Sequence, residues 1–177
     1  MSKIFFTSDL HIGHKNVLKL SNRPFEDIEH HDQTIIKNYN RVVGKNDICY
    51  ILGDISWNQS LNEYKRIFNE LNGEKYIIIG NHDSYKSLNR CYKEGIISGL
   101  SESKIIRYGT KFIYLSHLPC RQWAGYFKGY YHLYGHTHAN LDDFKQSTDI
   151  GVDCWEYEPV CIDEVLDYID ERCEKNV

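Results

Sequence analysis

The stretch KIFFTSDLH at residues 3–11 contains a pattern that recurs along this chain. Residues 3–8 are short, apolar and aromatic, which predicts a buried β-strand. Asp9 and His11 follow at once, so two side chains able to bind a metal stand where the strand ends. Because alternate residues of an extended chain point to the same side, both side chains can face one centre.

Four later segments repeat this arrangement of a predicted strand with polar residues at its end. They are residues 47–52 with Gly53-Asp54, 75–79 with Gly80-Asn81-His82-Asp83, 111–116 with Ser116-His117, and 131–134 with Gly135-His136-Thr137-His138. Ligands of open α/β sheets bind beyond the carboxyl ends of the strands. We therefore expect all of these loops to converge on one place.

The donors in these loops are aspartate, asparagine and histidine, which offer oxygen and nitrogen but no sulfur. Such a set suits hard to borderline divalent cations. Gly53, Gly80 and Gly135 have no side chain, so they let the backbone approach a crowded centre. One such motif alone is typical of a solvated turn, whereas all of them together at strand ends indicate a metal site.

The rest of the pattern predicts helices over residues 31–43, 61–71, 85–92 and 162–173. Ser60 and Glu63 form a capping box at the start of the second helix. A strand at residues 103–108 joins the next one through a Gly109-Thr110 turn, and residues 149–153 form a possible last strand. Strands alternate with helices first and then dominate, which predicts an α/β protein with two packed sheets and helices outside them.

Length and composition narrow the class of protein. A chain of 177 residues suits one domain, and a net charge of −4 argues against attraction to membranes or to long nucleic acid. The six cysteines contain no C-x-x-C pair, which excludes a zinc ribbon, and we expect reduced thiols that pack mostly as small hydrophobes. No signal peptide opens the chain and no stretch is long enough for a membrane span, so we expect a cytoplasmic protein.

Taken in order, the motifs resemble the signature of the calcineurin-like metallophosphoesterase family: Asp-x-His, Gly-Asp, Gly-Asn-His-Asp, a lone histidine and Gly-His-x-His. They run from Asp9 to His138, and the remainder most resembles small bacterial and phage members. The resemblance implies one metallophosphoesterase domain over residues 1–177. It also implies a four-layer α/β/β/α sandwich, in which two packed mixed sheets are flanked by helices.

The resemblance further implies a phosphatase or phosphodiesterase that binds two divalent ions, with manganese favoured over iron, nickel or zinc. It implies one ion held by Asp9, His11, Asp54 and His138, and a second held by Asp54, Asn81, His117 and His136. A hydroxide that bridges the two ions would attack a phosphomonoester or phosphodiester. His82 would face the substrate and protonate the leaving oxygen, and Asp83 would hold the His82 imidazole in its tautomer.

Several other residues have two interpretations each. His14 and Arg23 are candidates for substrate binding or ordinary loop residues, and Trp57 lines the pocket or packs in the core. Asp153 is a candidate partner for a ligand, while His30 and His31 are expected at the surface. The aromatic and basic segment 121–131 caps the site or packs as a loop.

Two other functions remain open. One is a metal-binding scaffold on the same fold that does not catalyse. The other is a mononuclear iron oxygenase, which needs only two histidines and a carboxylate and leaves Asn81 and His117 unexplained. For a phosphoesterase, the small size favours a compact substrate such as a nucleotide or a cyclic phosphodiester. The sequence leaves the physiological substrate and the oligomeric state open.

Overall fold

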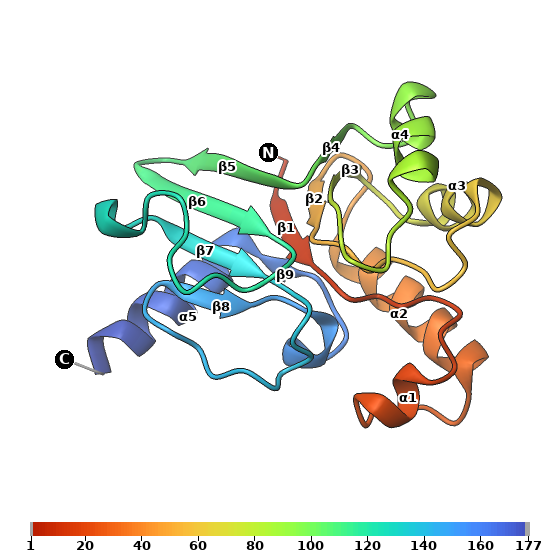
Figure 1. The fold of residues 1–177 in the computed structure, drawn as a ribbon, viewed down its shortest axis with the longest axis horizontal. Helices are drawn as coiled ribbons and strands as arrows, with labels where there is room; N and C mark the ends of the chain where they lie inside the picture. The colour runs from red at the N-terminus through yellow and green to blue at the C-terminus, as the bar shows by residue number, and fades with distance from the viewer. Residues whose placement is uncertain (1, 176–177) are drawn as a thin grey trace.

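The computed structural model describes residues 2–175 and contains two β-sheets with helices packed against them (Figure 1). In the first sheet, β1 (Ile4–Thr7), β2 (Ile48–Ile51), β3 (Glu74–Ile78) and β4 (Gly99–Ser101) are parallel, and β9 (Val160–Cys161) is antiparallel to β1. The second sheet contains β5 (Ser103–Tyr108), β6 (Lys111–Ser116), β7 (Tyr131–Tyr134) and β8 (Ser147–Asp149). Here β5 and β6 are antiparallel, while β6, β7 and β8 are parallel. The predicted α/β fold with two mixed sheets and flanking helices is confirmed.

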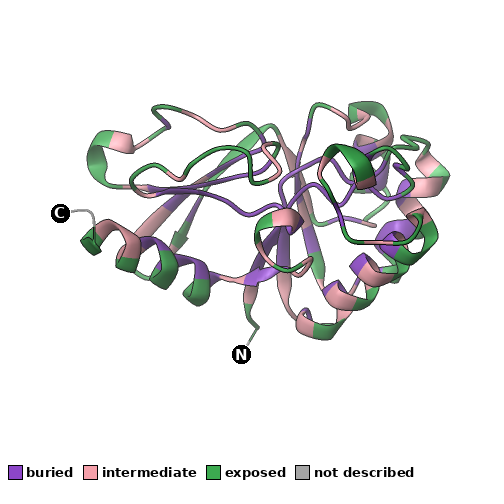
Figure 2. Cartoon of the chain, turned by 90° about the horizontal axis from the view of Figure 1, so that it is seen from below, coloured by how far each residue is buried: buried purple, intermediate pink, exposed green. Residues whose placement is uncertain are grey.

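The first sheet is covered on both faces, which explains why its central strands β1 and β2 are almost continuously apolar. One face packs against α2 (Ile28–Val42), α3 (Leu61–Glu70) and α4 (Tyr85–Lys93). Cys49 and Ile51 of β2 belong to this core, while Tyr50 of β2 and Leu52, directly after the strand, belong to the core on the other face. Figure 2 shows the central strands mostly buried and the helices buried only along one side. A strand buried on both faces shows no polar alternation.

The second core lies between the two sheets and also takes in α5 (Ile162–Lys175). Ile113 and Leu133 of the second sheet share this core with Leu166 and Ile169 of α5. The other face of the second sheet is covered by a loop that contains the 3-10 helix η1 (Tyr126–Lys128). In this loop, Trp123 stacks on His132 and Tyr130 stacks on Phe112. The aromatic segment 121–131 therefore packs as a loop on the sheet.

Helix starts follow their caps. Ser60 accepts a hydrogen bond from the Glu63 N–H at 3.2 Å, so it caps α3 as predicted. The other half of the predicted capping box is wrong, because the Ser60 N–H donates to Asn58 Oδ1 at 3.1 Å and the Glu63 carboxylate pairs with Arg66. Asp27 accepts a hydrogen bond from the His30 N–H at 2.8 Å, so α2 begins at Ile28 and not at residue 31. Within residues 2–175, five elements are not predicted by the sequence because each is too short to show a period: α1 (Val17–Leu20), β4, η1, the 3-10 helix η2 (Val152–Cys154) and β9.

The predicted strand at residues 149–153 is wrong in its bounds. The strand β8 covers Ser147–Asp149, and its three side chains are buried although all of them are polar. A polar strand has no hydrophobic alternation by which it can be found. After β8, Gly151 pairs with Ser8 beyond the end of β1, so the chain passes close to the first loop of the predicted site.

The six cysteines are all free thiols, but only Cys49 and Cys91 are buried. The expected packing as small hydrophobes therefore holds for these two residues. Within residues 2–175, no helix combines the length and the apolar character needed to cross a membrane.

His132 is buried at the centre of the second sheet and provides a test of its packing. Its Nε2 lies 2.9 Å from Ser116 Oγ and its Nδ1 lies 2.8 Å from Ser147 Oγ, so one residue ties β6, β7 and β8 together. Ser116 Oγ already donates to the Leu118 carbonyl, so it accepts from Nε2, and a neutral imidazole satisfies both contacts. Burial lowers the pKa of His132 from 6.5 to about 3.

We predict that His132 makes the protein sensitive to acid. Between pH 6.5 and 3 the unfolded chain binds a proton that the folded His132 does not. The free energy of unfolding should therefore fall as pH falls, by on the order of 1 kcal/mol per pH unit from this residue. Urea unfolding of the wild type and of His132→Asn at pH 7, 6, 5 and 4, with a chelator present, should give a shallower pH dependence for the variant. Equal slopes would contradict this role.

Candidate metal centre

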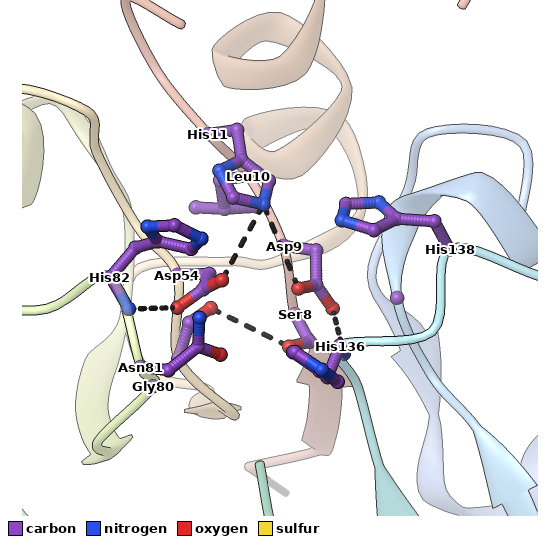
Figure 3. Close-up of polar contacts among 12 residues, drawn as sticks. Ser8, Asp9, Leu10, His11, Asp54, Gly80, Asn81, His82, His136 and His138 are labelled. Carbon is purple, nitrogen blue, oxygen red and sulfur yellow. Dashed lines mark hydrogen bonds and ion pairs between the residues drawn. The ribbon is translucent and has the colours of Figure 1, made fainter. Parts of the chain in front are cut away.

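The polar loops meet at the carboxyl edge of the two sheets, as Figure 3 shows. Asp9 and His11 come from the end of β1, Asp54 from the end of β2, and Asn81 and His82 from the end of β3. The second sheet contributes the loops after β6 and β7, with His117, His136 and His138. The structure therefore brings together all seven side chains that the sequence suggests as metal ligands.

Asp9, His11 and His138 form the first set of donors, here called the Asp9 group, whose ligand atoms lie within 4.8 Å of one another. Asp9 Oδ1 and both ring nitrogens of His11 are buried and have no hydrogen-bond partner. Burial raises the pKa of the Asp9 carboxyl, and it lowers the pKa of His11 to about 2, with a smaller effect from Arg23. Each unpaired buried polar group costs about 1–3 kcal/mol, so this group suits a bound cation.

Asp54, His117 and His136 form the second set, here called the Asp54 group, whose ligand atoms also lie within 4.8 Å of one another. His117 Nε2 lies 2.8 Å from Asn81 Oδ1, so the asparagine adjoins this group. The two carboxylate oxygens of Asp54 face different ways. Oδ1 lies 3.5 Å from His117 Nε2, while Oδ2 lies 3.6 Å from His11 Nε2. Asp54 therefore stands between the two groups.

The backbone conformation of the donor residues lowers the stability of the folded chain. Five of the converging residues have a positive φ in the left-handed region: Asp9 at 59°, His11 at 49°, Asp54 at 54°, His136 at 72° and His138 at 49°. For residues other than glycine this conformation is uncommon and costs on the order of 1–3 kcal/mol each. The surrounding structure imposes it at the positions where side chains must turn toward the centre.

The predicted need for glycine in these loops is confirmed. A Cβ atom on Gly80 would lie 2.2 Å from Asp54 Oδ1, and one on Gly135 would lie 2.1 Å from Ser8 Oγ and 2.5 Å from Asp9 Oδ2. A Cβ on Gly53 would lie 2.5 Å from Gly80 Cα. Each distance is far below van der Waals contact, so any other residue would displace a donor.

Asp83 does not contact the His82 ring in the structure, and the predicted pairing between them is wrong. Its Oδ2 accepts from the N–H groups of Asp54 and Gly80, both at 2.9 Å. Its Oδ1 accepts from Tyr64 Oη at 3.0 Å and from the Ile55 N–H at 3.2 Å. Asp83 therefore holds the backbone of the turn that carries Asp54. Burial raises the pKa of the Asp83 carboxyl, while these backbone contacts oppose the shift.

The sequence makes Arg23 a candidate for substrate binding, but this prediction is wrong. The Arg23 side chain is fully buried and cannot reach a phosphate. Its Nε and Nη2 donate to Asp153 at 2.8 and 2.7 Å, and Nη2 also donates to the Asp9 carbonyl at 2.8 Å. Its Nη1 lies 2.8 Å from His31 Nε2. The sequence predicts both His30 and His31 at the surface. His30 is exposed, but His31 is fully buried, so the prediction for His31 is wrong.

Asp153 is the expected partner of a candidate ligand. Its Oδ2 lies 2.7 Å from His138 Nδ1, which leaves His138 Nε2 for the Asp9 group. Burial lowers the pKa of His138. The hydrogen bond to Asp153 and the charge of Asp9 raise it, and together they outweigh the effect of burial, so the pKa of His138 lies above its usual value. A carboxylate on the second ring nitrogen fixes the orientation of a metal-binding histidine. His117 has a comparable contact, since its Nδ1 lies 2.6 Å from the Leu52 carbonyl.

His82, His14 and Trp57 lie along one side of the centre. The His82 N–H donates to Asp54 Oδ1 at 2.9 Å, but no residue in the described range 2–175 hydrogen-bonds to the His82 ring. His14 is 8% exposed and stacks on Trp57, which is 52% exposed and so does not belong to the core.

Asp149 also supports the centre, although no motif in the sequence points to it. Its Oδ2 accepts from Thr137 Oγ1 at 2.5 Å, and its Oδ1 accepts from the Gly151 N–H at 2.7 Å. Thr137 stands between His136 and His138, so Asp149 holds the loop that carries both histidines. No local pattern could reveal this role, because Asp149 lies on a polar strand and not in a motif.

The family model for calcineurin-like phosphoesterases matches residues 2–158. This chain belongs to the calcineurin-like phosphoesterase family. Among its relatives, the uncharacterized protein MJ1445 of Methanocaldococcus jannaschii is 33% identical over 180 residues, which cover 97% of this chain and 93% of that protein. The Gene 66 protein of Mycobacterium phage L5 is 30% identical over 204 residues, which cover 99% of this chain and 98% of the phage protein.

A solved structure supports the same fold. The crystal structure of AQ665, a protein of unknown function from Aquifex aeolicus, matches with a TM-score of 0.72 at 27% identity. The match covers 96% of this chain and 100% of the other. This solved structure therefore supports the fold over nearly the whole chain. The family match makes phosphoester hydrolysis the general class of activity for this chain.

We predict that Arg23 supports metal binding by the Asp9 group. Arg23→Lys keeps the charge but loses the paired contact with Asp153, so His138 and the Asp9 loop are held less firmly. Metal affinity of the Asp9 group should fall about 10- to 100-fold, as is typical when a residue behind a ligand is changed. Manganese titration by calorimetry, with the exposed Arg121→Lys as control, measures this change. Unaltered affinity in Arg23→Lys would show that the network is not needed.

Proposed function

We propose that this protein hydrolyses phosphomonoesters or phosphodiesters with two divalent metal ions. The observation that carries the proposal is the position of Asp54, with one carboxylate oxygen toward His11 and the other toward His117. Two cations held close together repel each other, and an anion between them offsets that repulsion. Two-metal sites of this kind are typical of phosphatases and nucleases.

In this proposal the Asp9 group and Asp54 hold one ion, and the Asp54 group with Asn81 holds the other. The donor set fits such ions, because Asp9 Oδ1 and both His11 nitrogens are buried without a protein partner. Oxygen and nitrogen donors without sulfur suit manganese, iron, nickel and zinc. Among these we favour manganese.

The chain's own residues prepare the site for hydrolysis. When bound, a pair of divalent ions supplies a water of lowered pKa and offsets charge on the phosphate oxygens. Asp83 and Gly80 hold the Asp54 turn in place. His82 has a ring without a hydrogen-bond partner in residues 2–175, so it is free to donate a proton to the leaving oxygen.

Two alternatives make different demands on the structure. A mononuclear iron oxygenase needs two histidines and one carboxylate, which the Asp9 group alone provides. It gives no role to the Asp54 group, whose ligand atoms also lie within 4.8 Å of one another. A scaffold that does not catalyse would have no need for a histidine at position 82 whose ring is left without a hydrogen-bond partner in residues 2–175. We propose a compact phosphoester substrate, such as a nucleotide or a cyclic phosphodiester, and a cytoplasmic location.

Paired variants test the proposal. Asp54→Ala should lose metal, because both ions depend on this carboxylate. His82→Ala should keep the metal and lose on the order of 10²-fold or more in kcat, the usual contribution of a positioned proton donor. Metal content by plasma mass spectrometry and turnover of bis(p-nitrophenyl) phosphate and p-nitrophenyl phosphate measure the two effects. His30→Ala is the matched control, since His30 is exposed on α2.

The outcomes separate the three functions. Two ions per chain with phosphoester turnover support the phosphoesterase. Two ions without turnover on any phosphomonoester or phosphodiester support the scaffold, and a single ion supports the oxygenase. Unchanged turnover in both Asp54→Ala and His82→Ala would exclude the proposed mechanism.

A further inference from the structure

Trp57 is an exposed tryptophan beside a polar centre. It follows Asp54 by three residues and is 52% exposed, whereas Trp123 is buried at 5%. Tryptophan is highly buried on average, so an indole that remains half in water at the edge of a candidate active site needs an explanation.

Three histidine rings connect Trp57 to the candidate centre, and the four rings form a closed circuit. Trp57 stacks on His14 with 4.1 Å between ring centroids and 6° between ring planes. His14 lies 5.3 Å from His11, and His11 lies 5.8 Å from His82. The ring of His82 lies 6.0 Å from that of Trp57, which completes the circuit. One face of the indole is therefore covered by His14, and the ring adjoins the proposed proton donor.

The backbone holds this arrangement rigidly. The Trp57 N–H donates to the Ile12 carbonyl at 3.0 Å, and Ser56 Oγ donates to the same carbonyl at 3.1 Å. The His14 N–H donates to the His11 carbonyl at 3.0 Å. The turn after β2 is thus tied to the loop after β1. A platform that is already in place loses little entropy when a ligand stacks on it.

We propose that Trp57, backed by His14, is the stacking platform for the leaving group, and that this leaving group is a nucleoside. The proposal rests on the proposed function, because it places the leaving oxygen at His82. A group that leaves next to His82 lies beside the indole, since the two rings are neighbours. The substrates are therefore phosphoesters whose alcohol carries a planar aromatic base.

The chemistry of the platform favours a base over other groups. Every base presents a flat face, so stacking on one aromatic ring binds bases of any identity. A quaternary ammonium group is bound best by several aromatic rings that surround it. At Trp57 the neighbouring rings are histidines, and one of them is the proposed proton donor. A single exposed indole therefore suits a flat base better than a quaternary ammonium group.

Binding of unreactive analogues tests the platform without turnover. The probe is the phosphonate of AMP in which CH2 replaces the ester oxygen, and its control is the matching ribose phosphonate without a base. With manganese present, the wild type should bind the adenosine phosphonate about 5- to 100-fold more tightly, the range expected from one stacked base. Trp57→Ala should abolish this preference and leave binding of the ribose phosphonate unchanged.

Two further variants make the result specific. Trp57→Phe keeps an aromatic face and should restore most of the preference. Phe127→Ala removes another exposed aromatic ring, 86% exposed on η1, and should bind both phosphonates like the wild type. Calorimetry gives all of these affinities under one set of conditions.

The failures can be told apart. Equal affinity of the wild type for both phosphonates, together with turnover of phosphoesters, would overturn the platform and leave the proposed function intact. A choline phosphonate that binds more tightly than the adenosine one, in a manner that depends on Trp57, would replace the nucleoside with a cationic leaving group. Binding of neither phosphonate and turnover of no phosphoester would overturn the platform and the proposed function together.

Discussion

The carboxylate of Asp54 is the constraint on which the rest of the centre depends. Its oxygens point to different donor groups, and each part of its surroundings fixes that orientation. Asp83 binds the Asp54 backbone, the His82 N–H binds Oδ1, and Gly80 leaves room for the same oxygen. The loops after β1, β2 and β3 are therefore one structural unit, because each contacts the Asp54 turn or its carboxylate.

This structural unit lowers the stability of the folded chain. Left-handed backbone at the donors and unpaired buried atoms on Asp9 and His11 both destabilise it. The apolar cores on the two faces of the first sheet offset that cost and keep the strand ends in register. A ligand that binds only the folded state adds further stability, so a cation at these donors would stabilise the loops that hold it.

The sequence predicts the features that depend only on residues close together in the chain. The apolar strands β1 and β2, the capped helix at Ser60 and the glycines beside the donors each follow from neighbouring residues. The roles of Arg23 and His31 do not, because the contact of Arg23 with Asp153 joins residues 130 positions apart. For the same reason, the local sequence does not reveal the role of Asp149, which contacts Thr137 twelve residues earlier. The motif predicts the right loop for Asp83 but the wrong partner, because its carboxylate reaches backbone N–H groups of Asp54 and Gly80 that only the folded chain brings near.

Anomalous diffraction from crystals grown with manganese tests the bridging position of Asp54 most directly. We expect two anomalous peaks, one at the Asp9 group and one at the Asp54 group, with an Asp54 oxygen bound to each. A single peak, or two peaks of which only one contacts Asp54, would contradict a centre built around this carboxylate.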